Sequence, residues 1–229
     1  DFARRNPTCK YSVLKNAGPS SVSSQSMVKQ LLKRIKNPYL IDQGDSSLCG
    51  PNIIMRCLAE SRPLDYVSYV LDLYEFGEAK IGNLVVKPSI DCLNASNKRN
   101  GSSTSSIAAC DWIALASLRD STNGIFDYQS TKNEISGITL PSTVEQWFKK
   151  IGYTNVINKT NLFFDKGIKI LAKAQTAYVN KQHVCLFINA KLVSLPLSAI
   201  LTPNHWVVLS DNIKVDGRLL NTIPSAELD

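Results

Sequence analysis

The sequence predicts an α+β fold in which the helices come first and the strands come last. Over most of the chain, apolar residues recur at the three- and four-residue spacing of amphipathic helices. Near the C-terminus the pattern changes to short runs of β-branched and aromatic residues bounded by Pro and Asn, which is typical of buried strands. Helices and strands segregated along the chain in this way indicate an α+β domain.

The composition is that of one globular domain. The chain has 229 residues, of which 44% are hydrophobic and 20% are charged, and this length suffices to bury one sizeable core. We therefore expect a single domain over residues 1–229, with a helical part at about 23–180 and a β part at about 181–229. No apolar run is long enough for a transmembrane helix, so no membrane insertion is expected. The chain begins at Asp1 without a charged-then-apolar leader, and we expect it to be a mature or excised piece of something longer.

Helical periodicity defines the first and larger part of the chain. The first helix is predicted over residues 26–35, with its apolar face at 28, 31, 32 and 35 and an end before Pro38. Its exposed face is expected to carry the basic residues Lys29, Lys33, Arg34 and Lys36. Further helices are predicted over 53–58, 64–76 (ending at Gly77), 107–118, from Pro141 with Ser142 and Glu145 as a capping box, and over 165–180.

Strands are predicted at 183–188 and 205–209, and Asp216-Gly217 predicts a hairpin turn. The stretch 87–106 lacks periodicity and is interpreted as a surface insertion, because a single helix follows it.

Six cysteines and two histidines limit the chemistry that the chain can perform. No C-x-x-C is present, and the nearest pair of cysteines is eight residues apart, so neither a metal site nor a cofactor is expected. Cys57, Cys110 and Cys185 lie in apolar stretches, where a free thiol behaves as a small hydrophobic side chain. The motifs of phosphate-binding loops, dinucleotide-binding folds, zinc peptidases and serine hydrolases are all absent.

Cys49 is the strongest candidate for a catalytic residue. It follows a polar turn and opens a predicted helix, and Gly50-Pro51 places Pro near the first helical position, where its missing N–H costs nothing. Free backbone N–H groups and the positive end of the helix dipole favour a thiolate there. Gln43 lies six residues earlier, across a loop long enough to fold back, so that its amide could help the Cys49 N–H to stabilise an oxyanion.

A thiol nucleophile needs a base within hydrogen-bond reach. With two histidines in the chain, that base must be His205 or His183. His205 begins a strand just after a turn, in Pro203-Asn-His-Trp-Val-Val-Leu209, and would present its imidazole at the edge of a sheet. His183 opens the neighbouring strand and is interpreted as a boundary residue.

Gln43, Cys49 and His205 together resemble the papain-like cysteine protease superfamily. In that superfamily the oxyanion Gln stands six residues before a Cys at the start of the central helix, and the catalytic His begins a strand of a C-terminal β part. The flanks Leu48-Cys-Gly-Pro51 and Asn204-His-Trp-Val-Val-Leu209 are similar to the compact papain-like toxins and effectors that bacteria deliver. The resemblance rests on about 14 residues of motif. It implies a papain-like fold and a cysteine protease.

The resemblance also implies a third catalytic residue, an Asn or Asp about 16 residues after the His. Asn221 has that spacing. However, a hairpin centred on Asp216-Gly217 would pair Asn221 with residue 212, far from His205, and a Cys–His dyad or an orienting residue beyond the chain stays open.

The resemblance further implies a protein substrate in a target cell, delivery by a bacterial secretion system into the target-cell cytoplasm, and a cognate inhibitor or immunity protein. The formal charge of +7 predicts an acidic surface on that inhibitor. Amidase, deamidase or transglutaminase chemistry on cell-wall peptides or glutamine side chains is the alternative within the same class. A basic module that binds nucleic acid or an anionic surface is the alternative from another class, but the basic residues are scattered and no aromatic residues alternate with them, so no nucleic acid is expected.

Overall fold

The structure is a computed structural model that describes residues 1–12, 22–44, 46–95, 107–126, 138–160, 167–189 and 205–227. It divides into two compact units, Asp1–Val156 and Ile157–Asp229, and each is described here by itself. Helices dominate and the sheets are small and antiparallel, so the predicted α+β class is confirmed. The division falls before the helix predicted over 165–180, which belongs to the same unit as the C-terminal strands.

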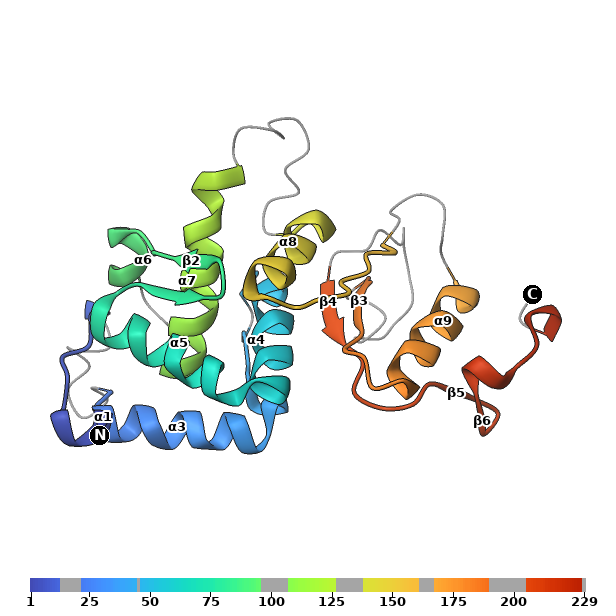
Figure 1. The fold of residues 1–229 in the computed structure, drawn as a ribbon, viewed down its shortest axis with the longest axis horizontal. Coiled ribbons are helices and arrows are strands. Elements are labelled where there is room, and N and C mark those ends of the chain that lie inside the picture. The colour runs from blue at the N-terminus through green and yellow to red at the C-terminus, as the bar shows by residue number, and fades with distance from the viewer. Residues whose placement is uncertain are drawn as a thin grey trace. The chain divides into compact units, whose positions relative to one another are not determined.

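The first unit is mostly helical (Figure 1). Its elements in chain order are α1 Phe2–Arg5, α3 Ser24–Lys36, the short 3-10 helix η2 Pro38–Leu40, α4 Cys49–Ser61, α5 Pro63–Phe76, β1 Ala79–Ile81, β2 Leu84–Val86, α6 Ile90–Asn94, α7 Ala109–Phe126 and α8 Pro141–Ile151. The expected loop stretch 87–106 contains α6 at its start, and residues 96–106 lie outside the described residues.

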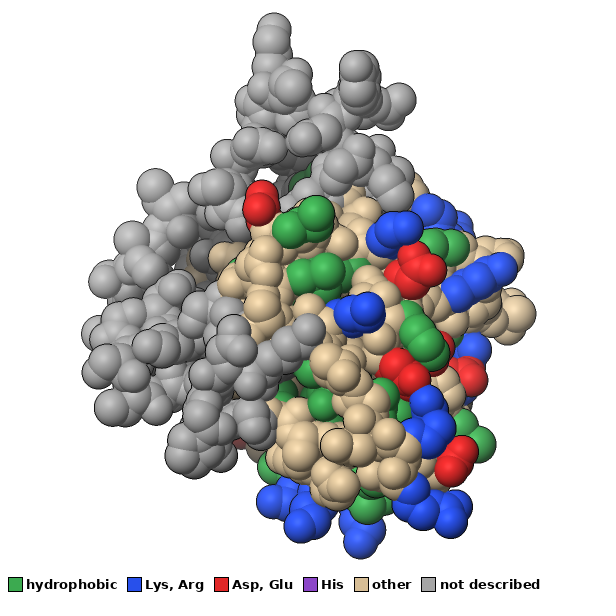
Figure 2. All heavy atoms as spheres, turned by 90° about the vertical axis from the view of Figure 1, so that its left-hand side faces the viewer, with side chains coloured by type: hydrophobic (Ala, Val, Ile, Leu, Met, Phe, Trp, Pro, Cys, Tyr) green, Lys and Arg blue, Asp and Glu red, His purple; other side chains and the backbone are tan. Residues whose placement is uncertain are grey.

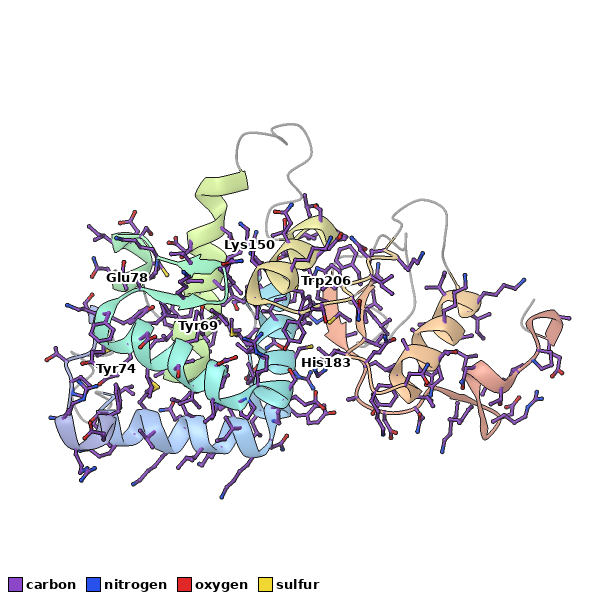
Figure 3. The ribbon with its side chains drawn as sticks, in the orientation of Figure 1. Tyr69, Tyr74, Glu78, Lys150, His183 and Trp206 are labelled. Atoms are coloured by element: carbon purple, nitrogen blue, oxygen red, sulfur yellow. The ribbon has the colours of Figure 1, made fainter. Side chains whose placement is uncertain are left out.

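The core of this unit lies where α4, α5 and α7 meet. Ile54 of α4, Leu73 of α5 and Leu115 of α7 are all inaccessible to solvent, as expected for helices that bury one apolar face each. Tyr69 of α5 lies between α5 and α7 (Figure 3), where its hydroxyl donates to the Ala114 carbonyl at 2.9 Å. α4 therefore packs against both α5 and α7.

A small hairpin, β1 and β2, interrupts the helices and was not predicted. Ala79 pairs with Val86 and Ile81 with Leu84, around a turn in which Gly82 has φ +56°. A side chain at Gly82 would meet the carbonyls of Lys150 and Ile151 at the end of α8. The Asn83 N–H donates to the Lys150 carbonyl at 2.7 Å, so the hairpin turn docks on α8 (Figure 3).

The buried face of α3 differs from the prediction. Ser24, Met27, Leu31 and Arg34 are buried, and Leu32, predicted to be buried, is 48% exposed. The expectation of Arg34 on an exposed basic face is therefore wrong. Its guanidinium turns inward because the buried Asp111 carboxylate on α7 forms an ion pair with it.

The predicted capping box of α8 is also wrong. The helix begins at Pro141 with Leu140 as its N-cap, and no side chain caps it. Proline at the first helical position already has a helical φ, so the helix begins before Ser142 can act as a cap. Glu145 instead accepts from Lys149 one turn later at 2.6 Å.

The described residues of the second unit form one α-helix, two strand pairs and two short 3-10 helices. Its elements are α9 Ile168–Val179, β3 Cys185–Ile188, β4 His205–Val208, β5 Lys214–Val215, β6 Arg218–Leu219 and the 3-10 helices η4 Leu220–Thr222 and η5 Ser225–Glu227. β3 and β4 are antiparallel, with Cys185 opposite Val208 and Ile188 opposite His205. Both predicted strands are therefore present, and Asp216-Gly217 forms the predicted turn between β5 and β6 with φ +49° and +79°.

None of the helices in the described ranges combines the length and the apolar composition needed to cross a bilayer. On the face of the first unit shown in Figure 2, basic side chains at the lower edge, at the height of α3 in Figure 1, give way above to a mixture of basic, acidic and apolar side chains. The described part of this face therefore shows basic residues dispersed among others.

Candidate functional site

Cys49 is the first residue of α4, the position that the sequence predicts for it. Leu48 is the N-cap, and no side chain caps the helix. The Asn52 N–H donates to the Leu48 carbonyl at 2.9 Å, which makes the first intrahelical bond, and Pro51 has no N–H to satisfy. The thiol is 4% exposed. The helix therefore begins without a side-chain cap, and the thiol lies at the positive end of the helix dipole.

Two backbone donors remain at this helix start. Among the described residues, nothing accepts a hydrogen bond from the N–H groups of Cys49 and Gly50. Both residues are buried, and a buried N–H without a partner is costly. Such paired donors beside a nucleophile are suited to hold an oxygen that becomes negative during acyl transfer.

Gln43 lies on a loop that side chains anchor on both sides. Before it, the Asp42 N–H donates to the Asp111 carboxylate at 3.3 Å, and the Asn52 side chain of α4 donates to the Ile41 carbonyl at 3.1 Å. After it, the Ser46 hydroxyl donates to the Gln43 carbonyl at 2.5 Å. The loop that leads into Cys49 is thus tied both to α4 itself and to α7.

Asp111 is the buried centre of that anchoring. Its side chain is inaccessible to solvent, and it accepts from Arg34 twice, from Nε at 3.1 Å and from Nη2 at 2.7 Å. One acid thereby joins α3, α7 and the loop of Gln43. Sequence reasoning missed this residue, although a carboxylate inside the apolar run 107–118 is a signal of a buried partner.

A second contact beside Cys49 was also missed. Thr139, which is 1% exposed, lies so close to Gly50 that any side chain at position 50 would overlap it. The Thr139 hydroxyl accepts from Nη1 of Arg119 on α7 at 2.9 Å. Arg119 is half-buried and lies close enough to Cys49 for the two side chains to interact electrostatically. A guanidinium therefore lies next to the start of α4.

His205 is the first residue of β4, as predicted. Burial lowers the pKa of its imidazole below the ordinary 6.5, so the ring is neutral at pH 7 and able to accept a proton. Trp206, the next residue, points to the other face of the pair and stacks on Phe187 with ring centroids 4.7 Å apart. The stacked rings fix the strand end that carries the imidazole (Figure 3).

Asn221 lies in η4, which packs against α9. Its side-chain oxygen is buried and has no hydrogen-bond partner among the described residues. No hydrogen bond joins it to His205, and in Figure 1 α9 lies between the β3–β4 pair and the β5–β6 end of the unit. The structure thus does not bring these two residues together, and a role for Asn221 stays a prediction.

The predicted site residues are divided between the two units. Cys49 and Gln43 belong to the first unit, and His205 and Asn221 belong to the second. The first unit by itself holds a buried thiol at a helix start, and the second by itself holds a neutral imidazole at a strand end.

None of the remaining cysteines forms a disulfide. Cys185 is partly exposed, and the others are buried: Cys9, Cys57, Cys92 and Cys110. Burial raises the pKa of Cys92 to about 12, and it likewise raises the pKa of Cys110, so both thiols stay protonated at neutral pH. His183 lies two residues before β3, so the strand begins later than the predicted 183. Within the described segments, no three His, Cys, Asp or Glu side chains are grouped so that they could hold a metal ion.

Comparison with known proteins gives no match: no family model, no curated protein and no solved structure is similar to this chain.

Proposed function

We propose that the chain is a papain-like cysteine peptidase that acts on protein targets. The single observation that carries the proposal is the start of α4, where a thiol, two N–H groups with no acceptor among the described residues and an anchored Gln-bearing loop are combined. A structural cysteine needs none of these neighbours. Cys57, two turns later on the same helix, is simply buried.

In the proposed mechanism Cys49 attacks the carbonyl carbon of a peptide bond. The Cys49 Sγ–C bond forms while the carbonyl oxygen becomes an oxyanion, held by the N–H groups at the helix start and by the Gln43 amide. His205 takes the thiol proton and returns it to the leaving amine. Water, activated by the same imidazole, then hydrolyses the acyl-enzyme and frees the thiol.

The proposal extends to a biological setting. The chain would be a toxin or effector domain, delivered by a bacterial secretion system into the cytoplasm of a target cell. The producing cell then needs an inhibitor protein, and the +7 charge favours an inhibitor with an acidic surface.

Thiol labelling tests the proposal directly. We expect a limiting amount of iodoacetamide to modify Cys49 before Cys185, although Cys49 is 4% exposed and Cys185 is more accessible. The reason is that a thiolate, and not mere exposure, determines the rate of alkylation. Peptide mass spectrometry after a short reaction identifies the modified residue.

The matched control is the same experiment on the His205→Ala variant, in which preference for Cys49 should fall. Labelling of Cys185 first in the unmodified protein would contradict the proposal.

A further inference from the structure

A guanidinium, that of Arg119, lies beside the candidate nucleophile. Arg119 donates one hydrogen bond, from Nη1 to the Thr139 hydroxyl, and among the described residues no carboxylate pairs with it. Four arginines of the first unit form an ion pair with an acid: Arg4 with Asp1, Arg5 with Glu75, Arg34 with Asp111, and Arg62 with Asp65. Among the described residues Arg56 likewise forms no ion pair, and its guanidinium lies over the Tyr39 ring. Arg119 therefore carries a partly desolvated charge that no acid among the described residues neutralises.

Partial burial makes the charged form of Arg119 less favourable. Burial lowers the pKa of Arg119, and the nearby Cys49 opposes that shift. Arginine nevertheless stays protonated at neutral pH. A bound anion would relieve the cost of holding this charge partly out of water.

The position of Arg119 is fixed relative to the helix start. Its Thr139 partner fills the space over Gly50, which allows that contact because it has no side chain. The Gly50 N–H is one of the two donors proposed for the oxyanion. The Thr139 hydroxyl thus links the guanidinium to the residue that carries this donor.

We propose that Arg119, oriented by Thr139, binds a carboxylate of the substrate next to the scissile carbonyl. The inference rests on the proposed function, because it names the substrate class of that same site: peptides with an acidic side chain or a free carboxyl group beside the bond that is cleaved. A guanidinium keeps several N–H donors in a planar fork after one is used, and this fork matches a carboxylate.

The test compares two alkylating reagents of nearly equal size, anionic iodoacetate and neutral iodoacetamide. Both report on Cys49, and neither requires peptide hydrolysis. We expect the ratio of the Cys49 alkylation rates, iodoacetate over iodoacetamide, to fall about tenfold in Arg119→Gln, as one charge-assisted contact is lost. Arg119→Lys keeps the charge but loses the planar set of guanidinium donors. Its ratio should lie between those of the unmodified protein and Arg119→Gln.

Arg56→Gln is the matched control. It removes the same charge from α4, where the Arg56 guanidinium lies 4.5 Å from the centroid of the Tyr39 ring, and it should leave the ratio unchanged. If Arg119→Gln fails to fold, Thr139→Val removes only the orienting hydroxyl and should lower the ratio in the same direction. Equal ratios in the unmodified protein and in the folded Arg119 or Thr139 variants would overturn the inference.

A second measurement uses matched peptides with Glu or Gln beside the scissile bond. The unmodified protein should have the higher kcat/KM for the Glu peptide, and Arg119→Gln should lose that preference. Hydrolysis that depends on Cys49 but shows no Glu preference would overturn the carboxylate inference and leave the peptidase proposal standing. An iodoacetate preference that depends on Arg119, in a protein without hydrolytic activity, would support carboxylate binding by Arg119 and overturn the peptidase proposal.

Discussion

Replacing Cys49 with Ala is expected to reduce peptide hydrolysis by at least about 10³-fold, because the step that forms the acyl-enzyme loses its nucleophile. No other thiol is placed to substitute for it. Of the remaining five, four are buried, and Cys185 lies on β3 in the second unit. The measurement is kcat/KM on a peptide substrate, or survival of cells that express the chain if the natural target is unidentified.

Cys57→Ala is the matched control, since it makes the same change on the same helix two turns further on. Cys57 is fully buried, so this variant should lose about 1 kcal/mol of stability and keep its activity per folded molecule. Hydrolysis by Cys49→Ala at the rate of Cys57→Ala would show that Cys49 is not the nucleophile. Gln43→Ala should lie between them, with a loss of about 10²-fold for one oxyanion donor.

Replacing Asp111 with Asn is expected to lower the free energy of unfolding by about 3–5 kcal/mol, because it leaves the Arg34 cation buried without its partner. Burial raises the pKa of Asp111, and Arg34 opposes that rise, so each partner depends on the other for a stable charge. Urea denaturation followed by circular dichroism measures the change.

The control for this prediction is the Arg62–Asp65 pair. Its N–O distance is 2.5 Å, but the two side chains are 34% and 45% exposed. Asp65→Asn should cost no more than about 1 kcal/mol, since exposed ion pairs contribute little. Equal losses in Asp111→Asn and Asp65→Asn would contradict the assignment of Asp111 as a buried anchor.

A double variant separates the anchoring role of Asp111 from its contribution to stability. Arg34→Met with Asp111→Leu replaces the ion pair by apolar side chains and should recover most of the stability. It cannot restore the acceptor for the Asp42 N–H, so the loop of Gln43 should be held less firmly and hydrolysis should stay reduced. Full activity in this double variant would show that the ion pair does not position the loop.

The sequence was sufficient to predict those helices and strands that have a simple apolar periodicity. α5 and β4 agree with their predicted ranges to within one residue, because each has a clear apolar period and lies next to Gly, Pro or Asn. α4 extends beyond the predicted 53–58 at both ends, and β3 begins two residues after the predicted 183. Cys49 and His205 were predicted at element starts, and each begins its element.

The features that the sequence did not predict depend on contacts between distant segments. Nothing near Arg34 indicates that it turns inward. Its partner Asp111 is 77 residues away, and only the packing of α3 on α7 brings them together. The same holds for Thr139, which reaches Gly50 across the core, and for the β1–β2 hairpin, whose turn docks on α8.

In the proposed mechanism Cys49 and His205 act on one substrate as a catalytic pair. The most direct measurement is cross-linking with 1,3-dibromoacetone, a short reagent that alkylates a thiol and then any imidazole within reach. We expect mass spectrometry to find the peptide of Cys49 joined to the peptide of His205, with hydrolysis lost in proportion, and to find no such species in His205→Ala. A Cys49 adduct joined to His183, or one that never forms a cross-link, would contradict the pair.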